Sequence, residues 1–69
     1  MGEWNEKRSG WAREMIEAAP FFSEEEGSYT NIKDALCNIR HLCDEEGIEF
    51  ADVSSGARMI YEGEVADDE

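Results

Sequence analysis

The sequence predicts an all-α protein, a small three-helix bundle with a disordered acidic C-terminal tail. Three observations carry this prediction: apolar residues recur at helical spacing in three segments, glycine or proline closes each segment, and the last residues are mostly acidic. A chain of 69 residues allows one domain with a modest core, and its aromatic residues supply enough apolar surface to fold it. We therefore expect a single helical domain over residues 1–63 and an acidic tail over residues 64–69.

The first segment with helical spacing covers residues 3–19. Trp4, Trp11 and Met15 fall on one side of it. We favour core packing for this stripe over an exposed binding site, because large aromatic side chains usually pack against other helices. Pro20 ends the segment, since a proline ring clashes with the preceding turn of a helix.

The connector after this segment begins with Phe21 and Phe22, which we expect to insert their rings into the core. Residues 23–30 are expected to form a loop or a single short turn. Ser23 is a residue type that begins helices, and Gly27 is one that ends them.

The second segment has the clearest helical pattern. Its apolar stripe repeats at spacings of four, three and four residues: Ile32, Leu36, Ile39 and Cys43. Asn31 is the expected N-cap, and Asp34 places negative charge at the favourable end of the helix dipole. Gly47 is the expected left-handed residue after the last turn. Residues 44–46 are acidic in that turn, where each negative charge costs roughly a few tenths of a kcal/mol.

The two cysteines, Cys37 and Cys43, both lie in this second helix. At about 100° per residue their side chains point roughly 120° apart, so they cannot form a disulfide within the helix. We expect free thiols in a reducing compartment, with Cys43 in the core and Cys37 partly exposed.

The third helix is expected to begin near residues 50–52 and to end at Glu62, with Gly63 closing it. Its apolar face is formed by Phe50, Val53, Ala57, Ile60 and Tyr61. Residues 64–69 are rich in acids and contain no base, and we expect them to be disordered.

Charge is the most unusual property of the chain. Eighteen acidic residues against six basic ones give a formal net charge of −12, and residues 48–69 alone carry −6. Such a chain is repelled by nucleic acid and by anionic membranes, so neither is an expected partner. The sequence shows no secretory signal and no apolar run of about 20 residues, which predicts a cytoplasmic protein without a membrane span.

No residue pattern in the sequence indicates catalysis. Cys37 and His41, one helical turn apart, come nearest to a nucleophile with its base, but surrounding acids disfavour the reactive thiolate. Asp34 and Asp44 add metal-ligand types on the same helix, yet a structural zinc site gathers four ligands, usually from two elements. We therefore expect no enzyme activity, no catalytic residue, no metal site and no cofactor.

Three acidic runs are the candidate partner-binding residues. In order of preference they are Asp44, Glu45, Glu46, Glu49 and Asp52, then Glu24, Glu25 and Glu26, then Glu62 and Glu64. Carboxylates three or four residues apart on a helix recur at about 5–6 Å, a spacing similar to that of phosphates along a strand. A basic protein surface built to hold nucleic acid is therefore the expected partner.

The segment NIKDALCNIRHLCDEEGIEFADVSSGARMIYEGE resembles the C-terminal part of small uncharacterised proteins carried by phages and other mobile elements. This resemblance is structural and implies no catalytic residue. The whole profile, a very short and strongly acidic helical protein, is similar in type to anti-CRISPR proteins and other phage inhibitors that mimic nucleic acid. That likeness implies a non-enzymatic inhibitor in the cytoplasm of a host cell, monomeric or homodimeric, that blocks a nucleic-acid-binding defence complex.

Two other functions stay open. A helical regulatory or assembly module would bind its partner through an aromatic patch of Trp4, Trp11, Phe21 and Phe22, because tryptophan is enriched at interface centres. Adaptation to a saline cytoplasm would give the charge no specific partner, although residues 1–19 carry a net charge of only −1.

Overall fold

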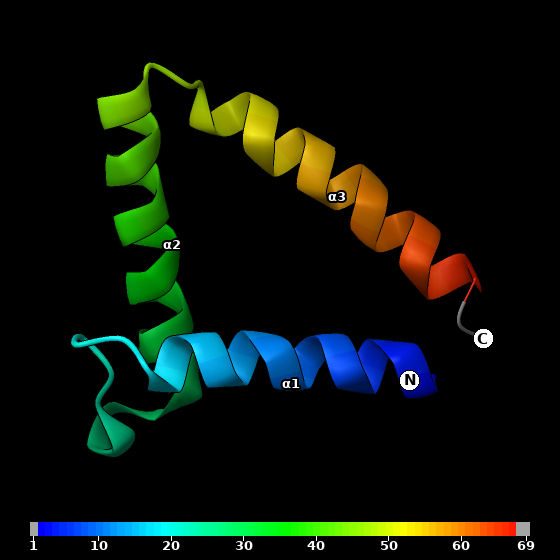
Figure 1. Ribbon diagram of the computed structural model, residues 1–69, viewed down its shortest axis with the longest axis horizontal. Helices are drawn as coiled ribbons and strands as arrows, with labels where there is room; N and C mark the ends of the chain where they lie inside the picture. The colour runs from blue at the N-terminus through cyan, green and yellow to red at the C-terminus, as the bar shows by residue number, and fades with distance from the viewer. Residues whose placement is uncertain (1, 68–69) are drawn as a thin grey trace.

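A computed structural model describes residues 2–67 of the chain. Over that range the elements are α1 (Glu3–Glu17), a short 3₁₀ helix η1 (Glu24–Glu26), α2 (Gly27–Glu46) and α3 (Phe50–Asp67). The predicted fold class, an all-α three-helix bundle, is confirmed (Figure 1).

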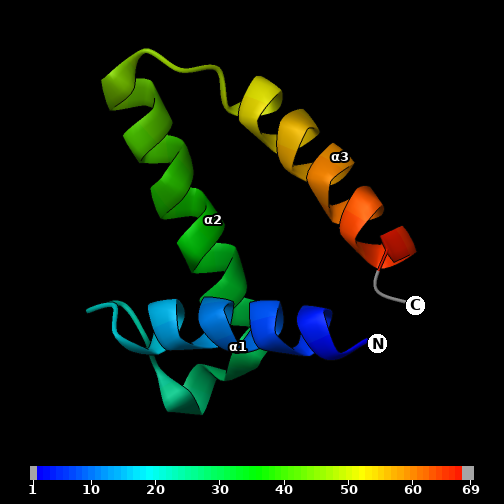
Figure 2. The ribbon, with the colours of Figure 1, turned by 45° about the vertical axis from the view of Figure 1, so that its right-hand side comes forward.

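The three helices form the sides of an open, flat triangle. α1 crosses the N-terminal part of α2, α3 turns back from the far end of α2, and the C-terminal end of α3 approaches the N-terminal end of α1 (Figures 1 and 2). The molecule measures 35 × 32 × 16 Å along its principal axes. The helices therefore meet mainly near their ends. Within residues 2–67, long parts of each helix pack against no other helix.

α1 ends at Glu17, slightly before the predicted end at residue 19, and the chain then turns at Pro20. The Phe22 N–H donates to the Ala19 carbonyl at 3.1 Å, which places Pro20 second in a β-turn, where its fixed φ is favoured. Phe21 and Phe22 are half-buried, so the expected insertion into the core is achieved only in part.

The predicted single turn after Ser23 is present as η1, and Gly27 follows it with a positive φ of 83°. The next helix starts at that same glycine. Gly27 therefore separates η1 from α2, and the loop expected to continue to residue 30 is helical instead.

Because α2 begins at Gly27, the assignment of Asn31 as its N-cap is wrong. Asn31 lies inside the helix and is 3% exposed. Its side-chain amide donates to the carbonyls of Ser23 at 2.7 Å and Gly27 at 2.8 Å, and its Oδ1 accepts the Ser23 N–H at 2.9 Å. Asn31 thus holds the connector against α2 by side-chain hydrogen bonds.

The predicted end of α2 at Gly47 is confirmed, and the backbone hydrogen bonds show its cause. Gly47 adopts a φ of 71°, in the left-handed region. The Ile48 N–H donates to the Cys43 carbonyl at 2.8 Å and the Gly47 N–H to the Asp44 carbonyl at 3.3 Å, as in a Schellman motif. Two carbonyls of the last turn are thereby paired, and the chain reverses toward α3.

Alanine substitutions at two glycines are expected to change stability in opposite directions. Gly47→Ala forces a side chain into the left-handed region and should lower the free energy of unfolding by about 1 kcal/mol. Gly56→Ala improves the helix propensity of α3 where nothing lies within 4 Å of the new Cβ, and should raise it by about 0.5–1 kcal/mol. Thermal unfolding followed by circular dichroism measures both. A stabilising Gly47→Ala would contradict the left-handed cap.

α3 extends to Asp67, so the predicted closure of the helix at Gly63 is wrong, as is the expected disorder of residues 64–67. A glycine inside a helix costs about 1 kcal/mol relative to alanine. The continued helix places Glu64 in contact with Arg8 and Asn5 of α1, and these contacts act against that cost. Residues 68–69, the rest of the predicted tail, lie outside the described residues.

This arrangement encloses little apolar surface. Within residues 2–67 the one buried apolar side chain is Cys43, 6% exposed, and Cys37 is exposed, as predicted for both. The predicted core packing of α1 is wrong, since Trp4 is 53% and Trp11 56% exposed. The physical reason is the open triangle, which brings neither α2 nor α3 over the exposed side of α1.

Candidate partner-binding surface

The structure brings five of the predicted acidic residues together where α2 passes into α3. This surface, the acidic corner, consists of Asp44, Glu45, Glu46, Glu49 and Asp52. All five residues are exposed. The turn at Gly47 folds the chain back, so the last turn of α2 and the first turn of α3 lie at the same end of the molecule (Figure 1).

The acids of this corner contribute differently to folding. Asp52 lies in the first turn of α3, where negative charge is favourable, and the Glu49 carbonyl accepts the N–H groups that open this helix. Asp44, Glu45 and Glu46 lie in the last turn of α2, which contains no basic residue. Each of these three charges costs roughly a few tenths of a kcal/mol at that end of the dipole. Folding therefore does not explain them.

No ion pair within residues 2–67 neutralises the acidic corner. The ion pairs in that range join Lys7 to Glu3, Arg8 to Glu64 and Arg58 to Glu62. Arg40 lies one turn before Asp44 in the sequence, but its guanidinium stacks over the Phe50 ring, 5.6 Å from the ring centre. The five carboxylates remain available to cations from outside the chain.

The second predicted run, Glu24–Glu26, forms η1 beside the opposite end of α2 and is also exposed. The 20 residues of α2 correspond to about 30 Å of helix. This length exceeds the Debye length of about 10 Å at 0.1 M salt. The two runs therefore act as separate electrostatic sites and do not merge into one surface.

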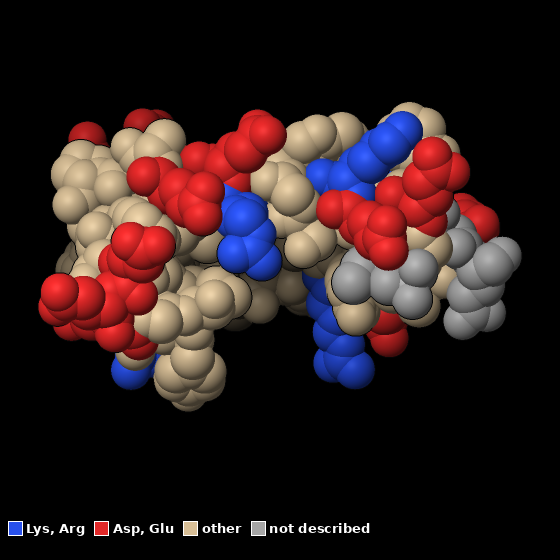
Figure 3. All heavy atoms as spheres, turned by 90° about the horizontal axis from the view of Figure 1, so that it is seen from below, with Lys and Arg blue, Asp and Glu red and all other residues tan. Residues whose placement is uncertain are grey.

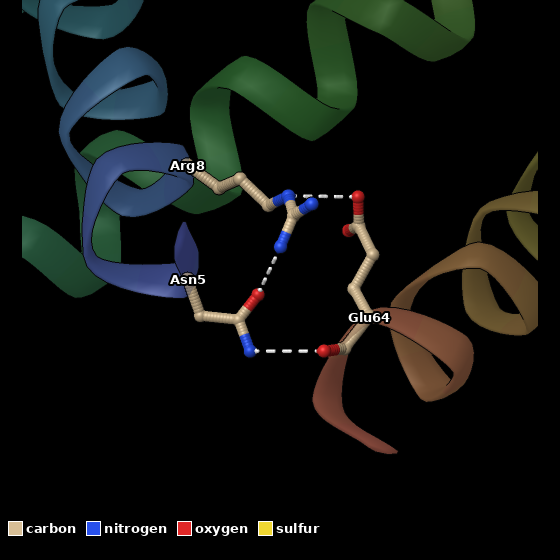
Figure 4. A network of polar contacts seen from close by, with 3 residues as sticks. All are labelled: Asn5, Arg8 and Glu64. Atoms are coloured by element: carbon tan, nitrogen blue, oxygen red, sulfur yellow. Dashed lines mark hydrogen bonds and ion pairs between the residues drawn. The ribbon is translucent and has the colours of Figure 1, made fainter. Parts of the chain in front are cut away.

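The third predicted run is engaged within the molecule. Arg8 Nε lies 2.8 Å from Glu64 Oε2, and Asn5 accepts from Arg8 at 2.8 Å and donates to the Glu64 backbone carbonyl at 3.3 Å (Figure 4). Glu62 Oε1 lies 3.7 Å from Arg58 Nε. The network of Asn5, Arg8 and Glu64 closes α3 onto α1. No pattern in the sequence predicts this network, because Asn5 and Arg8 lie near one end of the sequence and Glu64 near the other.

Charge is distributed unevenly over the surface. Figure 3 views the molecule from the side of α1 and η1, and shows Asp and Glu in separate groups toward both ends of that face. Lys and Arg lie among and between these groups, with uncharged surface around them. An evenly acidic coat, the pattern expected from adaptation to a saline cytoplasm, is absent from this face of the described residues.

The catalytic and metal-binding groups weighed from the sequence are not assembled. Cys37 and His41 are both exposed on α2, and no hydrogen bond joins them in the described part of the chain. Over the same range, no three side chains of His, Cys, Asp or Glu form a group suited to a metal ion. An open hollow of about 330 Å³ between α1 and α2 has apolar lining residues that include Ala12, Ile16, Phe22 and Ile32. Neither Cys37 nor His41 lines it.

The alternative aromatic patch is divided by the fold. Trp4 and Trp11 are exposed on α1, and Lys7 Nζ lies 4.4 Å from the centre of the Trp4 ring. Phe22 instead lines the hollow together with Ala12, which is about 100° around α1 from Trp11. Phe22 therefore lies on a different side of α1 from the two tryptophans.

Comparison of the chain with protein-family models, with curated proteins and with solved structures finds no match. None of the helices within residues 2–67 combines the length and the apolar character that crossing a bilayer requires.

Proposed function

We propose that the protein is a non-enzymatic inhibitor that mimics nucleic acid. It presents the acidic corner to a basic, nucleic-acid-binding surface of a host defence complex of the CRISPR–Cas type, in the cytoplasm of the host cell and without a cofactor. Glu24–Glu26 supply a second, separate contact. Glu62 and Glu64 contribute less, because Arg58 and Arg8 already pair with them.

The observation that carries the proposal is the position of Asp44, Glu45 and Glu46. These residues are exposed and make no ion pair within the described range. They also occupy the helix end where negative charge lowers stability. Residues that break a local stability rule without a compensating contact are typical of functional sites.

Inhibition follows from competition for the same cations. The clustered carboxylates of the acidic corner meet Lys and Arg side chains that otherwise contact phosphates, and a groove filled in this way has no room for nucleic acid. The net charge of −12 speeds encounter with a basic target, and this attraction weakens as salt screens it.

Capture of the target at two salt concentrations tests the proposal. The immobilised protein is incubated with lysate of a phage-susceptible bacterium in about 50 mM or about 200 mM NaCl, and duplex DNA is then added as competitor. We expect at least about tenfold less capture at the higher salt, and release of the target by DNA. A captured complex that keeps its own DNA or RNA while this protein is attached would contradict mimicry.

The exposure of Trp4 and Trp11 favours a second candidate function, a regulatory or assembly module that binds a protein through α1. Tryptophan side chains carry a large share of the energy at many protein interfaces. This function predicts capture that is nearly independent of salt and is lost on Trp11→Ala. The two salt concentrations of the same experiment therefore separate the candidates.

A further inference from the structure

The chain exposes more surface than a compact protein of its mass. Its accessible surface is 5808 Å², whereas about 4400 Å² is typical of a folded monomer of 7.8 kDa. Its radius of gyration is 13.6 Å, against about 11 Å for a compact domain of this length. The excess, about 1400 Å² per chain, lies within the range of about 1000–2500 Å² that each subunit of an obligate dimer buries.

Part of this exposed surface is apolar and lies on the side of α3 that faces the interior of the triangle. The contact of Glu64 with Arg8 shows which side that is (Figure 4). Val53 and Ile60 precede Glu64 by 11 and 4 residues, so they lie on the same side of the helix. Val53 is 42% and Ile60 65% exposed, so α1 and α2 leave them uncovered.

α2 contributes a matching stripe. Ile32 lines the hollow against α1, and Cys43 is buried beside the turn to α3. Leu36 and Ile39 lie between them on the same side of α2, within about 40° of Ile32 and Cys43 around the helix. Ile32 and Leu36 are each half exposed. We define the inner apolar face by five residues: Ile32, Leu36, Ile39, Val53 and Ile60.

We propose that a second copy of this chain covers the inner apolar face, so that the protein is an obligate two-fold homodimer. A two-fold interface is self-complementary, which suits an apolar face that meets its own copy. The excess area matches what such a dimer buries. The acidic corner lies at the turn between α2 and α3 and remains outside the interface, accessible to a basic target.

The dependence on salt distinguishes dimer formation from binding to the proposed target. Two chains of −12 repel each other, and salt screens that repulsion, so the dimer becomes tighter as salt rises. Binding to a basic target changes in the opposite direction. The dimer does not depend on the proposed function, and either proposal can fail while the other stands.

Sedimentation equilibrium of the wild-type protein between about 1 and about 100 μM, at about 0.15 M NaCl, is the first test. We expect twice the chain mass of 7.8 kDa, and a thermal midpoint that rises with protein concentration. A folded monomer at the highest concentration would overturn the proposal and leave the inner apolar face to a different partner. A thermal midpoint that does not change with concentration would also overturn it.

A matched pair of lysine substitutions on α3 locates the interface. Ile60→Lys places a charge on the inner apolar face, whereas Met59→Lys places the same charge about 100° around the helix, where Met59 is 72% exposed. We expect the dimer dissociation constant to rise at least about 100-fold for Ile60→Lys and less than about threefold for Met59→Lys. Equal effects would contradict an interface at this face.

If a variant unfolds, circular dichroism at each protein concentration still distinguishes the effects of Ile60→Lys and Met59→Lys. Chains of an obligate dimer lose their fold when they separate. Helix loss in Ile60→Lys that is greatest at low concentration, with Met59→Lys intact, supports the dimer. Helix loss in Ile60→Lys that is independent of concentration contradicts it.

Discussion

Converting Asp44, Glu45 and Glu46 to their amides together is expected to weaken binding to the captured target about 30-fold and to make the protein slightly more stable. Three exposed charge pairs are lost, which amounts to about 2 kcal/mol of binding free energy. Stability rises, by up to about 1 kcal/mol, because negative charge is removed from the C-terminal end of α2. Titration calorimetry measures the binding, and thermal unfolding measures the stability.

The chain offers a control with the same change of charge. Converting Glu24, Glu25 and Glu26 to glutamine also removes three negative charges, but from η1 beside the N-terminal end of α2. Negative charge is favourable there, so this variant should lose stability slightly. Because Glu24–Glu26 form only the second contact with the target, its binding should fall by about threefold, well short of the 30-fold loss at the acidic corner. Equal losses of binding in the two variants would show that net charge, and not the acidic corner, attracts the target.

Local signals in the sequence are sufficient for the fold class and for some helix ends. Apolar spacing indicates three helices, and Gly47 closes α2 with the left-handed geometry expected of it. The same rule fails at Gly63, where the long-range contact between Glu64 and Arg8 keeps α3 helical. The residue type of Asn31 predicts a helix cap, but Asn31 lies inside α2, where its side chain forms hydrogen bonds with Ser23 of the connector.

For the candidate site, too, the sequence predicts local features but not contacts between distant residues. Asp44 and Asp52 are close in sequence on either side of a turn, so their grouping at one corner could be predicted. Whether a carboxylate is paired depends on helix packing, and the sequence does not indicate that Arg8 engages Glu64. The sequence also does not indicate that Trp11 is exposed, because an apolar stripe shows which side of a helix is apolar but not what covers it.

Asn31→Ala is expected to cause a large loss of stability. It removes three hydrogen bonds and leaves the Ser23 N–H and two carbonyls without a side-chain partner at the junction of connector and α2. Because such groups are partly desolvated, the free energy of unfolding should fall by about 2–3 kcal/mol. For a domain of this size that lowers the thermal midpoint by about 10–20 °C. Calorimetry at one fixed protein concentration measures the change.

Two further variants show whether the hydrogen bonds are responsible. Asn38→Ala makes the same substitution at an exposed position of α2 and should change stability by less than about 0.5 kcal/mol. Asn31→Asp keeps the acceptor for the Ser23 N–H but turns a carboxylate oxygen toward two carbonyls, which raises the pKa of the introduced group in the folded state. Relative to wild type, its stability should therefore fall as the pH rises above about 4, and recover toward lower pH. If Asn31→Asp matches wild type at every pH, the amide donor does not hold the connector, and burial of the side chain alone accounts for the effect of Asn31→Ala.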